Sequence, residues 1–223
     1  MITVHHLENS RSQRVLWLLE ELGLNYEVKR YERDKTTSLA PPELMAVHPL
    51  GKSPVITDDG VVVAETGAIV EYVVGKYGGG RLVPLAGSPE GLRYTYWMHM
   101  AEGTVMPLLV TTLIFNRIDS GTPWLIRPIA KAISGQVRSS YIGPNLKACL
   151  DYMEAELGKS TWFAGAELTA ADVMMSFPVE AAAVRANLTT EYPRLAAFLD
   201  RIHRRAAYKT ALERGGPYAL LGS

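Results

Sequence analysis

The sequence predicts two domains of different structural class, an α/β domain at residues 1–80 followed by an all-α domain at residues 90–223. Three observations indicate this division. Short β-rich runs alternate with amphipathic helical runs in the first third of the chain. The stretch "GGGRLVPLAGSPE", residues 78–90, is rich in glycine and proline and has no hydrophobic period. Strand patterns are absent beyond it, so we place a linker at residues 81–89.

The α/β domain begins with a strand, a helix and a second strand. "ITVHHL" (residues 2–7) is a short β-rich run, and "YEVKRYE" (residues 26–32) alternates like a half-exposed strand. Between them, apolar residues at i, i+3, i+4 and i+7 predict an amphipathic helix that ends at Gly23. This stripe consists of Val15, Leu18, Leu19 and Leu22. Two strands joined by such a crossover helix pair in parallel.

A short helix, a hairpin and a longer helix complete this domain. "PPELMAVHP" (residues 41–49) predicts a short helix bounded by prolines. "PVITDDGVVVAE" (residues 54–65) has two β-branched runs about an Asp-Gly turn, which is a strong hairpin signal. Thr66–Tyr77 has the apolar spacing of a second amphipathic helix. The order β-α-β-α-β-β-α, with a mixed four-stranded sheet, is that of a thioredoxin-like domain.

Helical patterns fill the remainder of the chain. The predicted helices are Gly91–Ile118, Trp124–Leu157, Ala170–Ala186 and Tyr192–Ala211. Thr169 and Asp172 have the spacing of a capping box at the start of the third of these, so we give them a structural role.

The composition excludes several classes of function. Of the 223 residues, 48% are hydrophobic, and 23 basic residues balance 23 acidic ones, so no net positive field attracts nucleic acid or an anionic membrane. The stretch "MPLLVTTLIF" has about half the length of a bilayer span. A single cysteine, Cys149, and the lack of a signal-peptide pattern favour a cytoplasmic location. The five histidines form no metal-ligand pattern, and the glycosylation acceptor at Asn187 has no secretion signal beside it.

The first predicted helix begins in "NSRSQR", with Ser10 and Ser12 near its start. A helix N-terminus carries unpaired N–H groups and about half a positive charge. One interpretation is simple capping by either serine. The other is that a serine hydroxyl donates a hydrogen bond to an anion at the helix start. A thiolate suits this position, because helix N-termini lower thiol pKa values.

Two further stretches contain candidate binding residues. In "HPLGKSPVI", Pro54 begins a strand, and a cis Ser53–Pro54 bond would leave the Ser53 backbone free to pair with an extended peptide. Lys52 is either a solvated surface lysine or a partner for a carboxylate. In "VVVAETGAIVEYV", Glu65 and Thr66 precede a helix, where they either cap it or bind the zwitterionic end of a ligand.

Taken together, these motifs resemble a known family. Ser10-x-x-x-Arg14 before "VLWLLEELGL", then "HPLGKSPVI", then "AETGAIVEYV", resemble the glutathione-binding domain of cytosolic glutathione transferases. "RYTYWMHMAEGTVMPLL" is similar to the first helix of that family's all-α domain, particularly in its bacterial and fungal serine-type branch. "FAGAELTAADVMMSFPV" is similar to its buried capping-box helix. The likeness covers nearly the whole chain.

The resemblance implies a glutathione transferase that conjugates the tripeptide to a hydrophobic electrophile. It implies that Ser10 holds the glutathione sulfur as a thiolate, with Ser12 and Asn9 as alternatives. It assigns the cysteinyl backbone to Ser53 before Pro54, and the glycyl carboxylate to Lys52. It assigns the γ-glutamyl end to Glu65 and Thr66. His48 lies at a position where some classes of the family have an additional ligand contact.

The resemblance also implies an electrophile site between the domains and a homodimer. The candidate lining residues are Met106, Leu109, Phe115 and Tyr218 with its C-terminal neighbours. No cysteine precedes Cys149, so thiol exchange through an enzyme cysteine at the first helix is unfavoured. Reduction of peroxides or disulfides by glutathione, and a non-catalytic glutathione-binding protein, are the alternatives. No metal, nucleic acid or membrane is expected as a partner.

Overall fold

The computed structural model describes residues 1–185 and 191–221, so the Asn187 acceptor lies outside the described residues. A four-stranded sheet contains β1 (Ile2–Leu7), β2 (Tyr26–Tyr31), β3 (Val55–Asp58) and β4 (Val61–Ala64). The spatial order is β2-β1-β3-β4. β1 pairs with β2 in parallel, and the β1–β3 and β3–β4 pairs are antiparallel. The predicted mixed sheet of a thioredoxin-like domain is confirmed.

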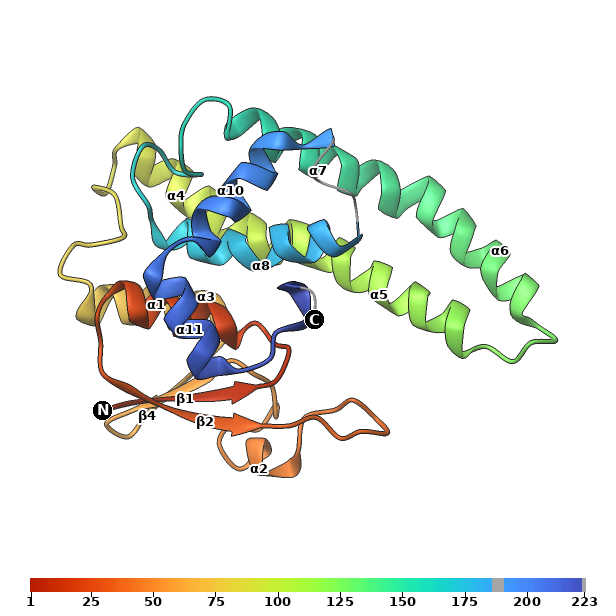
Figure 1. Cartoon of the computed structure of the whole chain (residues 1–223), viewed down its shortest axis with the longest axis horizontal. Helices are drawn as coiled ribbons and strands as arrows, with labels where there is room; N and C mark the ends of the chain where they lie inside the picture. Colours follow the sequence, from red (N-terminus) through yellow and green to blue (C-terminus); the bar gives the residue numbers. More distant parts are fainter. Residues whose placement is uncertain (186–190, 222–223) are drawn as a thin grey trace.

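Three helices accompany the sheet: α1 (Ser12–Glu21), α2 (Pro42–Met45) and α3 (Thr66–Tyr77). α1 and α3 lie on one face of the sheet and α2 on the other (Figure 1). Every residue of α1 from Ser12 to Leu19 is buried, including Trp17. The sequence predicts one apolar stripe on this helix, but α1 contacts the sheet on one side and two helices of the second domain on the other.

The second part of the chain is helical, as predicted. No helix or strand lies between Tyr77 and Pro89, and the predicted linker falls within this segment. The helices are α4 (Pro89–Met100), η1 (Ala101–Val105), α5 (Met106–Gly121), α6 (Arg127–Val137), η2 (Arg138–Ile142), α7 (Gly143–Glu156), α8 (Ala170–Arg185), α10 (Pro193–His203), α11 (Ala206–Gly215) and η3 (Ala219–Leu221).

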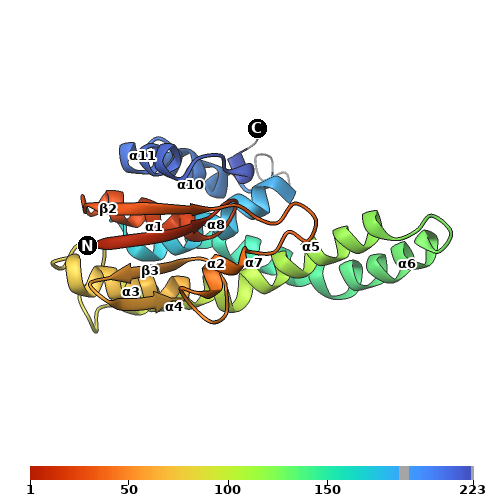
Figure 2. The ribbon, with the colours of Figure 1, turned by 90° about the horizontal axis from the view of Figure 1, so that it is seen from below.

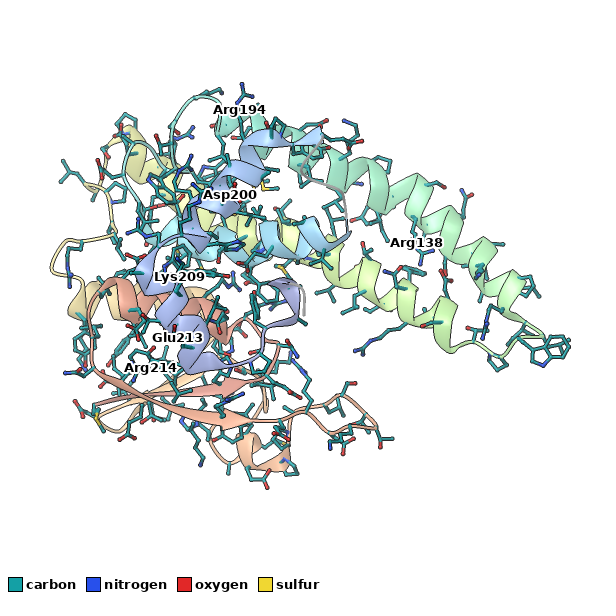
Figure 3. The ribbon with its side chains drawn as sticks, in the orientation of Figure 1. Arg138, Arg194, Asp200, Lys209, Glu213 and Arg214 are labelled. Atoms are coloured by element: carbon teal, nitrogen blue, oxygen red, sulfur yellow. The ribbon has the colours of Figure 1, made fainter. Side chains whose placement is uncertain are left out.

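α5 and α6 form an arm that projects away from the rest of the molecule (Figures 1 and 2). Arg138, at the start of η2, links the end of α6 to α5 within this arm, and Figure 3 labels its side chain. Its guanidinium lies 2.7 Å from an Asp119 carboxylate oxygen and donates a hydrogen bond of 3.0 Å to Asn116. Both acceptors lie on α5, so this one side chain holds η2 against it.

Two predicted long helices are interrupted by turns of π-helix, η1 and η2. Each interruption stands just before a proline, Pro107 or Pro144. Proline has no N–H to donate four residues back, and its ring clashes with the carbonyl there. In η1 the Met106 N–H donates to the Ala101 carbonyl, five residues back, and the helix continues beyond the proline.

The continuous helical run Pro89–Gly121 is long and apolar enough to cross a membrane, by length and composition alone. From the sequence we compared only the ten residues Met106–Phe115 with the length of a bilayer span, whereas the helical run in the structure has 33 residues. In its most apolar window 39% of residues are buried within the protein. One such helix is weak evidence for a span, because core helices of soluble proteins pass the same test.

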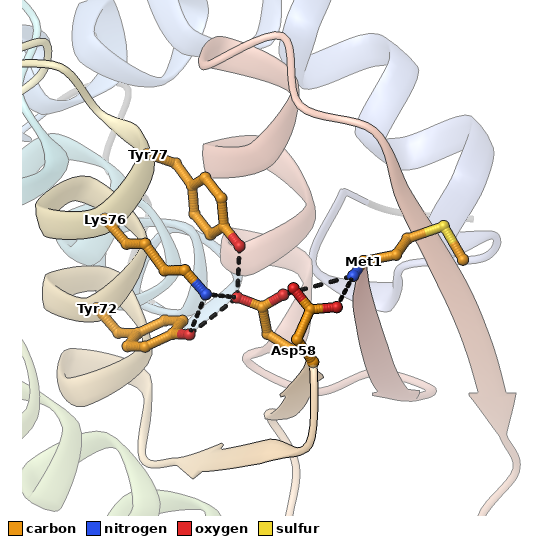
Figure 4. A network of polar contacts seen from close by, with 6 residues as sticks. Met1, Asp58, Tyr72, Lys76 and Tyr77 are labelled. Carbon is orange, nitrogen blue, oxygen red and sulfur yellow. Dashed lines mark hydrogen bonds and ion pairs between the residues drawn. The ribbon is translucent and has the colours of Figure 1, made fainter.

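A buried carboxylate joins β3 to α3. Asp58 accepts hydrogen bonds from Tyr72 (2.8 Å), Lys76 (2.7 Å) and Tyr77 (2.5 Å), while the Met1 amine lies 3.7 Å from its other oxygen (Figure 4). Burial disfavours the charged carboxylate, but the hydrogen bonds from Lys76 and the two tyrosines outweigh it. They hold the pKa of Asp58 well below its usual range.

We expect Asp58→Asn to lower the free energy of unfolding by about 2 kcal/mol at pH 7, because hydrogen bonds to a charged acceptor are lost. A carboxyl whose folded pKa is depressed stabilises the fold above its unfolded pKa and loses that contribution as the pH falls. The difference between variant and wild type should therefore shrink below about pH 4. Urea unfolding at pH 7 and pH 3.5 measures both effects.

The neighbouring Asp59, whose side chain is 71% exposed, provides the matched control. We expect Asp59→Asn to change stability by less than about 0.5 kcal/mol at either pH. Equal losses in the two variants, or a loss at Asp58 that does not depend on pH, would contradict this account.

Candidate functional site

The topology gathers the predicted site residues at one edge of the sheet. β1 ends at Leu7, and the chain then turns into α1 past Ser10. The antiparallel register pairs His5 with Val55 and Val55 with Ala64. The start of β3, with Ser53 before it, and the end of β4, with Glu65 after it, therefore lie at the same edge as the carboxyl end of β1. Residues more than fifty positions apart in the sequence meet there.

Ser10 lies at the head of a chain of hydrogen bonds. Its Oγ accepts from the Ser12 N–H at 3.3 Å, is 2.7 Å from the Ser12 Oγ and is 3.3 Å from the Ser53 Oγ. The Ser12 Oγ in turn lies 2.9 Å from His6 Nδ1. Ser12 is fully buried, whereas Ser10 lines a cavity. Of the two serines, only Ser10 is therefore placed to meet a ligand.

His6 supports this chain as a neutral imidazole. Burial, and then the positive charge of Arg30, lower the pKa of His6 to about 4, although a hydrogen bond with the Gly215 backbone acts in the opposite sense. A neutral ring has one N–H donor and one acceptor nitrogen. Either the ring donates to Ser12 Oγ and the hydroxyl protons point toward Ser10, or Ser12 donates to the ring.

Asn9 shares the cavity with Ser10. It has a left-handed backbone, with φ of 50°, and its Oδ1 accepts a hydrogen bond of 2.8 Å from the Ala219 N–H. This bond holds the η3 segment at the end of the cavity, and Figure 1 shows this short helical turn, in dark blue, between the sheet and the helical domain. Asn9 therefore already has a structural partner.

Ser53 and Lys52 occupy the loop before β3. The Ser53–Pro54 peptide bond is cis, and the backbone ladder between β1 and β3 begins only at Val55. The Ser53 Oγ donates to the His5 carbonyl at 3.0 Å and accepts from the Leu7 N–H at 3.2 Å, which fixes the loop against β1. Lys52 is exposed and lines a neighbouring cavity of about 370 Å³, which also contacts Ser53.

Glu65 and Thr66 stand at the start of α3. Glu65 is exposed and has φ of 72°, a left-handed conformation that a side chain with a Cβ rarely adopts. Such a conformation costs about 1–3 kcal/mol and persists only where the surroundings impose it. Thr66 is buried as the first residue of the helix. Neither Glu65 nor Thr66 lines the cavity at Ser10. His48, the further residue that the resemblance suggested, is half-buried, and its Nδ1 accepts a hydrogen bond of 3.4 Å from the Leu50 N–H.

The cavity at Ser10 has a volume of about 620 Å³ and lies between the sheet edge and the helical domain. Ligand pockets commonly have such volumes and positions. Asn9, Ser10, Arg11, Arg33, Ser38 and Ser53 line it from the first domain. Met106, Val110, Leu113, Arg117, Phe177, Ala181, Ala219 and Leu220 line it from the second.

Of the predicted pocket residues, Met106 lines the cavity, and so do Ala219 and Leu220, the C-terminal neighbours of Tyr218. Leu109 is fully buried in the core, and Phe115 is half-buried outside the cavity. Tyr218 is buried and donates a hydrogen bond of 2.7 Å to Glu180, so its neighbours Ala219 and Leu220 reach the cavity in its place. The helical period explains the difference, since Val110, one residue past Leu109, falls on the same face as Met106.

Sequence reasoning also missed the three arginines of the lining and the His6–Ser12 pair. A helical face starting at Met106 repeats at Val110, Leu113 and Arg117, and this spacing is visible in the sequence. Arg33 and His6 carry no such signal, because only the folded chain brings them beside Ser10.

The chain is thus a two-domain protein, in which a thioredoxin-like domain is followed by a helical domain and a cavity lies between the two. Family models agree: that for the glutathione S-transferase N-terminal domain matches residues 1–75, and that for the C-terminal domain matches residues 142–201. The chain belongs to the glutathione S-transferase family.

Curated relatives and a solved structure support this assignment. Glutathione S-transferase 3 of Schizosaccharomyces pombe is 39% identical over 182 residues, which cover 82% of this chain and 74% of the relative. Glutathione S-transferase 1 of Saccharomyces cerevisiae is 31% identical over 223 residues, covering 96% and 95%. A crystal structure of a glutathione S-transferase from Actinobacillus pleuropneumoniae matches with a TM-score of 0.80 at 31% identity, covering 100% and 97%.

The state of His6 is directly measurable. We expect its imidazole to stay neutral from pH 8 down to about pH 5, because its pKa lies near 4. Nitrogen-15 NMR of the histidine rings, with the His6 signals assigned from a His6→Gln variant, measures this. A midpoint near the ordinary value of about 6.5 would contradict the burial argument. In the unfolded chain the His6 ring has the ordinary pKa of about 6.5, so between about pH 6.5 and pH 4 the unfolded state binds a proton that the folded state does not. The free energy of unfolding should therefore fall as the pH drops through this range.

Proposed function

We propose that the chain binds glutathione at the sheet edge and transfers its thiol, held as a thiolate by Ser10, to a hydrophobic electrophile in the cavity between the domains. Membership of the glutathione S-transferase family makes glutathione the co-substrate and thiol transfer the activity. One observation carries the choice of residue. Ser10 lies at the start of α1, lines the cavity, and is supported from behind by Ser12 and His6.

The role of Ser10 is electrostatic. A free thiol has a pKa near 8.5, and lowering it by about two units requires roughly 2.7 kcal/mol of preferential binding of the thiolate. A hydroxyl donor contributes a charge-assisted hydrogen bond, and the N-terminus of α1 adds its partial positive charge. Together these have the required size. The thiolate then attacks the electrophile, and the displaced group leaves with the electron pair of the broken bond.

The remaining site residues bind the rest of the tripeptide. In this proposal the backbone of Ser53, outside the β1–β3 ladder, pairs with the cysteinyl residue, with Pro54 fixing the turn. Lys52 meets the glycyl carboxylate. The carboxylate of Glu65 accepts from the γ-glutamyl ammonium, and Thr66 with the N–H groups of α3 holds its carboxylate. Residues 1–80 thus form the glutathione domain and residues 90–223 supply the electrophile site.

Cys149 has no part in this chemistry. It lies on α7, well along the chain from the α1 N-terminus, and is half-buried against the core. Burial raises the pKa of its thiol, which favours the unreactive protonated form. Thiol transfer therefore depends on bound glutathione rather than on a cysteine of the chain. With only one cysteine, the chain also suits a reducing cytoplasmic location.

The activity is tested by incubating the protein with glutathione and a panel of aryl chlorides, peroxides and disulfides. We expect conjugation of the aryl chlorides. Turnover restricted to peroxides or disulfides would make the chain a glutathione-dependent reductase instead. Binding of glutathione without turnover of any substrate would make it a binding protein.

Within the same assay, we expect Ser10→Ala to lower kcat/KM for aryl chloride conjugation at least about tenfold at pH 6.5, with a smaller loss at pH 9. The reason is that the variant must deprotonate the bound thiol without its donor. Ser12→Ala and Asn9→Ala are the comparison variants. Retained activity in Ser10→Ala, together with loss in either comparison variant, would move the role to Ser12 or Asn9.

We also propose that two copies of the chain associate through the arm. Several large apolar side chains are exposed there, and exposed apolar surface marks interaction sites when it gathers on one face. They include Ile114, Ile118, Trp124, Leu125, Ile126, Ile129 and Ile133. Light scattering at micromolar concentration should give twice the 24.5 kDa mass of one chain, and Ile129→Glu with Ile133→Glu should restore the single mass. A wild-type protein of single mass would contradict the dimer.

A further inference from the structure

One face of α5 forms the side of the cavity that belongs to the helical domain. Met106, Val110, Leu113 and Arg117 all line it, at spacings of 4, 3 and 4 residues. Residues so spaced share one face of an α-helix. Three apolar side chains thus lead to a guanidinium at the far end of the face. Side chains on a helix lean toward its N-terminus, so the Arg117 head extends back over the apolar part.

Two more arginines face the same cavity from the first domain. Arg11 lies 3.2 Å from a Glu102 carboxylate oxygen, so its charge is matched within the protein. Arg33 donates to the backbone carbonyls of Glu8 and Ser38, at 3.3 and 3.1 Å, and these acceptors carry no net charge. Among the residues in ranges 1–185 and 191–221, neither Arg33 nor Arg117 has a carboxylate within ion-pair distance.

Arg33 and Arg117 lie close enough to interact. Burial lowers the pKa of Arg33, the Glu8 carboxylate raises it, and the positive charge of Arg117 lowers it again. The two guanidiniums thus repel each other across the cavity. An anion between them would relieve this repulsion and could accept two charge-assisted hydrogen bonds. Within the described part of the chain, no acidic side chain lines the cavity.

We propose that the electrophile site selects aromatic or other apolar electrophiles that carry a carboxylate or sulfonate, bound between Arg117 and Arg33. The apolar body lies along Met106, Val110 and Leu113, with the anionic group at the arginine end. This inference rests on the proposed function and names the substrate class of the same site. Arg117 is a specificity-determining residue in it, and Arg33 contributes from the opposite domain.

The carboxylates of glutathione are the competing occupant, and the position of Arg117 argues against them. Arg117 belongs to the helical domain and continues the apolar face of α5. Lys52, Glu65 and Thr66, the residues assigned to the two ends of the tripeptide, do not line this cavity. Arg33 lies in both the Ser10 cavity and the Lys52 cavity, so Arg117 is the cleaner residue to test.

The test compares two aryl chlorides that undergo one reaction, neutral 1-chloro-2,4-dinitrobenzene and anionic 4-chloro-3,5-dinitrobenzoate. In both, the glutathione sulfur forms a bond to the ring carbon that bears chlorine, chloride leaves with the bonding electrons, and the thiol proton passes to solvent. We expect Arg117→Gln to lower the ratio of kcat/KM, anionic over neutral, about tenfold. This is the lower end of the range for hydrogen bonds to charged groups. Arg117→Lys should keep most of the ratio.

Arg204→Gln is the matched control, because it removes the same charge from a side chain that is 82% exposed and does not line the cavity. Its ratio should equal that of the wild type. In wild type, 0.5 M salt should lower the ratio, since screening weakens exposed charge pairs.

The inference is overturned if Arg117→Gln leaves the ratio within about twofold of wild type. It is also overturned if that variant raises KM for glutathione equally with both chlorides, which would assign Arg117 to the tripeptide. Failure of the proposed function looks different, since neither chloride would then be converted by the wild-type protein.

Discussion

The position of the α1 N-terminus depends on one buried cation. Arg14 is 1% exposed, and its guanidinium donates to the Met174 carbonyl on α8 at 2.6 Å and pairs with Glu102 in η1. It also lies over the Phe177 ring, 5.4 Å from the centroid. Removing one partner of a buried pair commonly costs about 3–5 kcal/mol, because the other charge stays buried. This side chain therefore fixes α1 against two segments of the helical domain.

The geometry of the cavity follows from this tie. Arg14 lies one turn after Ser10. The contact of Arg14 with the helical domain therefore also positions the Ser10 hydroxyl relative to the residues of that domain that line the cavity. Glu102 lies in the π-turn η1, and it pairs with Arg11 as well as with Arg14. The π-turn accommodates Pro107 and places a carboxylate beside the helix start.

The sequence predicted the strands, the helices and the mixed sheet of the first domain because these are largely local in origin. Hydrophobic period, the Asp-Gly turn and the prolines indicate which segments are strands, the crossover rule predicts the parallel pairing of β1 with β2, and the hairpin pairs β3 with β4. Once β1, β3 and β4 are paired, Ser10, Ser53 and Glu65 must share an edge. The hydroxyl oxygens of Ser10 and Ser53 lie 3.3 Å apart at this edge, a distance that strand order alone does not set.

The site features that the sequence did not predict depend on tertiary contacts, which leave no pattern in the sequence. Ser12 resembles a helix cap in sequence, but its hydroxyl is taken by His6 from the neighbouring strand. Leu109 and Val110 are adjacent apolar residues, and which of them faces the cavity is fixed by how α5 rotates after η1. Arg33 and Arg117 are ordinary surface arginines in sequence, 84 positions apart, until two domains bring them to one cavity.

The C-terminal segment shows why a buried residue can still shape the cavity. Glu180 is buried on α8 and accepts hydrogen bonds from Tyr208 and Tyr218, with His203 Nε2 at 3.0 Å. Burial and then the Glu180 charge raise the pKa of Tyr218 well above its usual value, so the phenol remains a donor. A permanent donor on a buried carboxylate anchors the segment, and the following residues, held also by Asn9, then close the end of the cavity. The aromatic ring predicted to touch the electrophile instead determines where the chain that touches it must run.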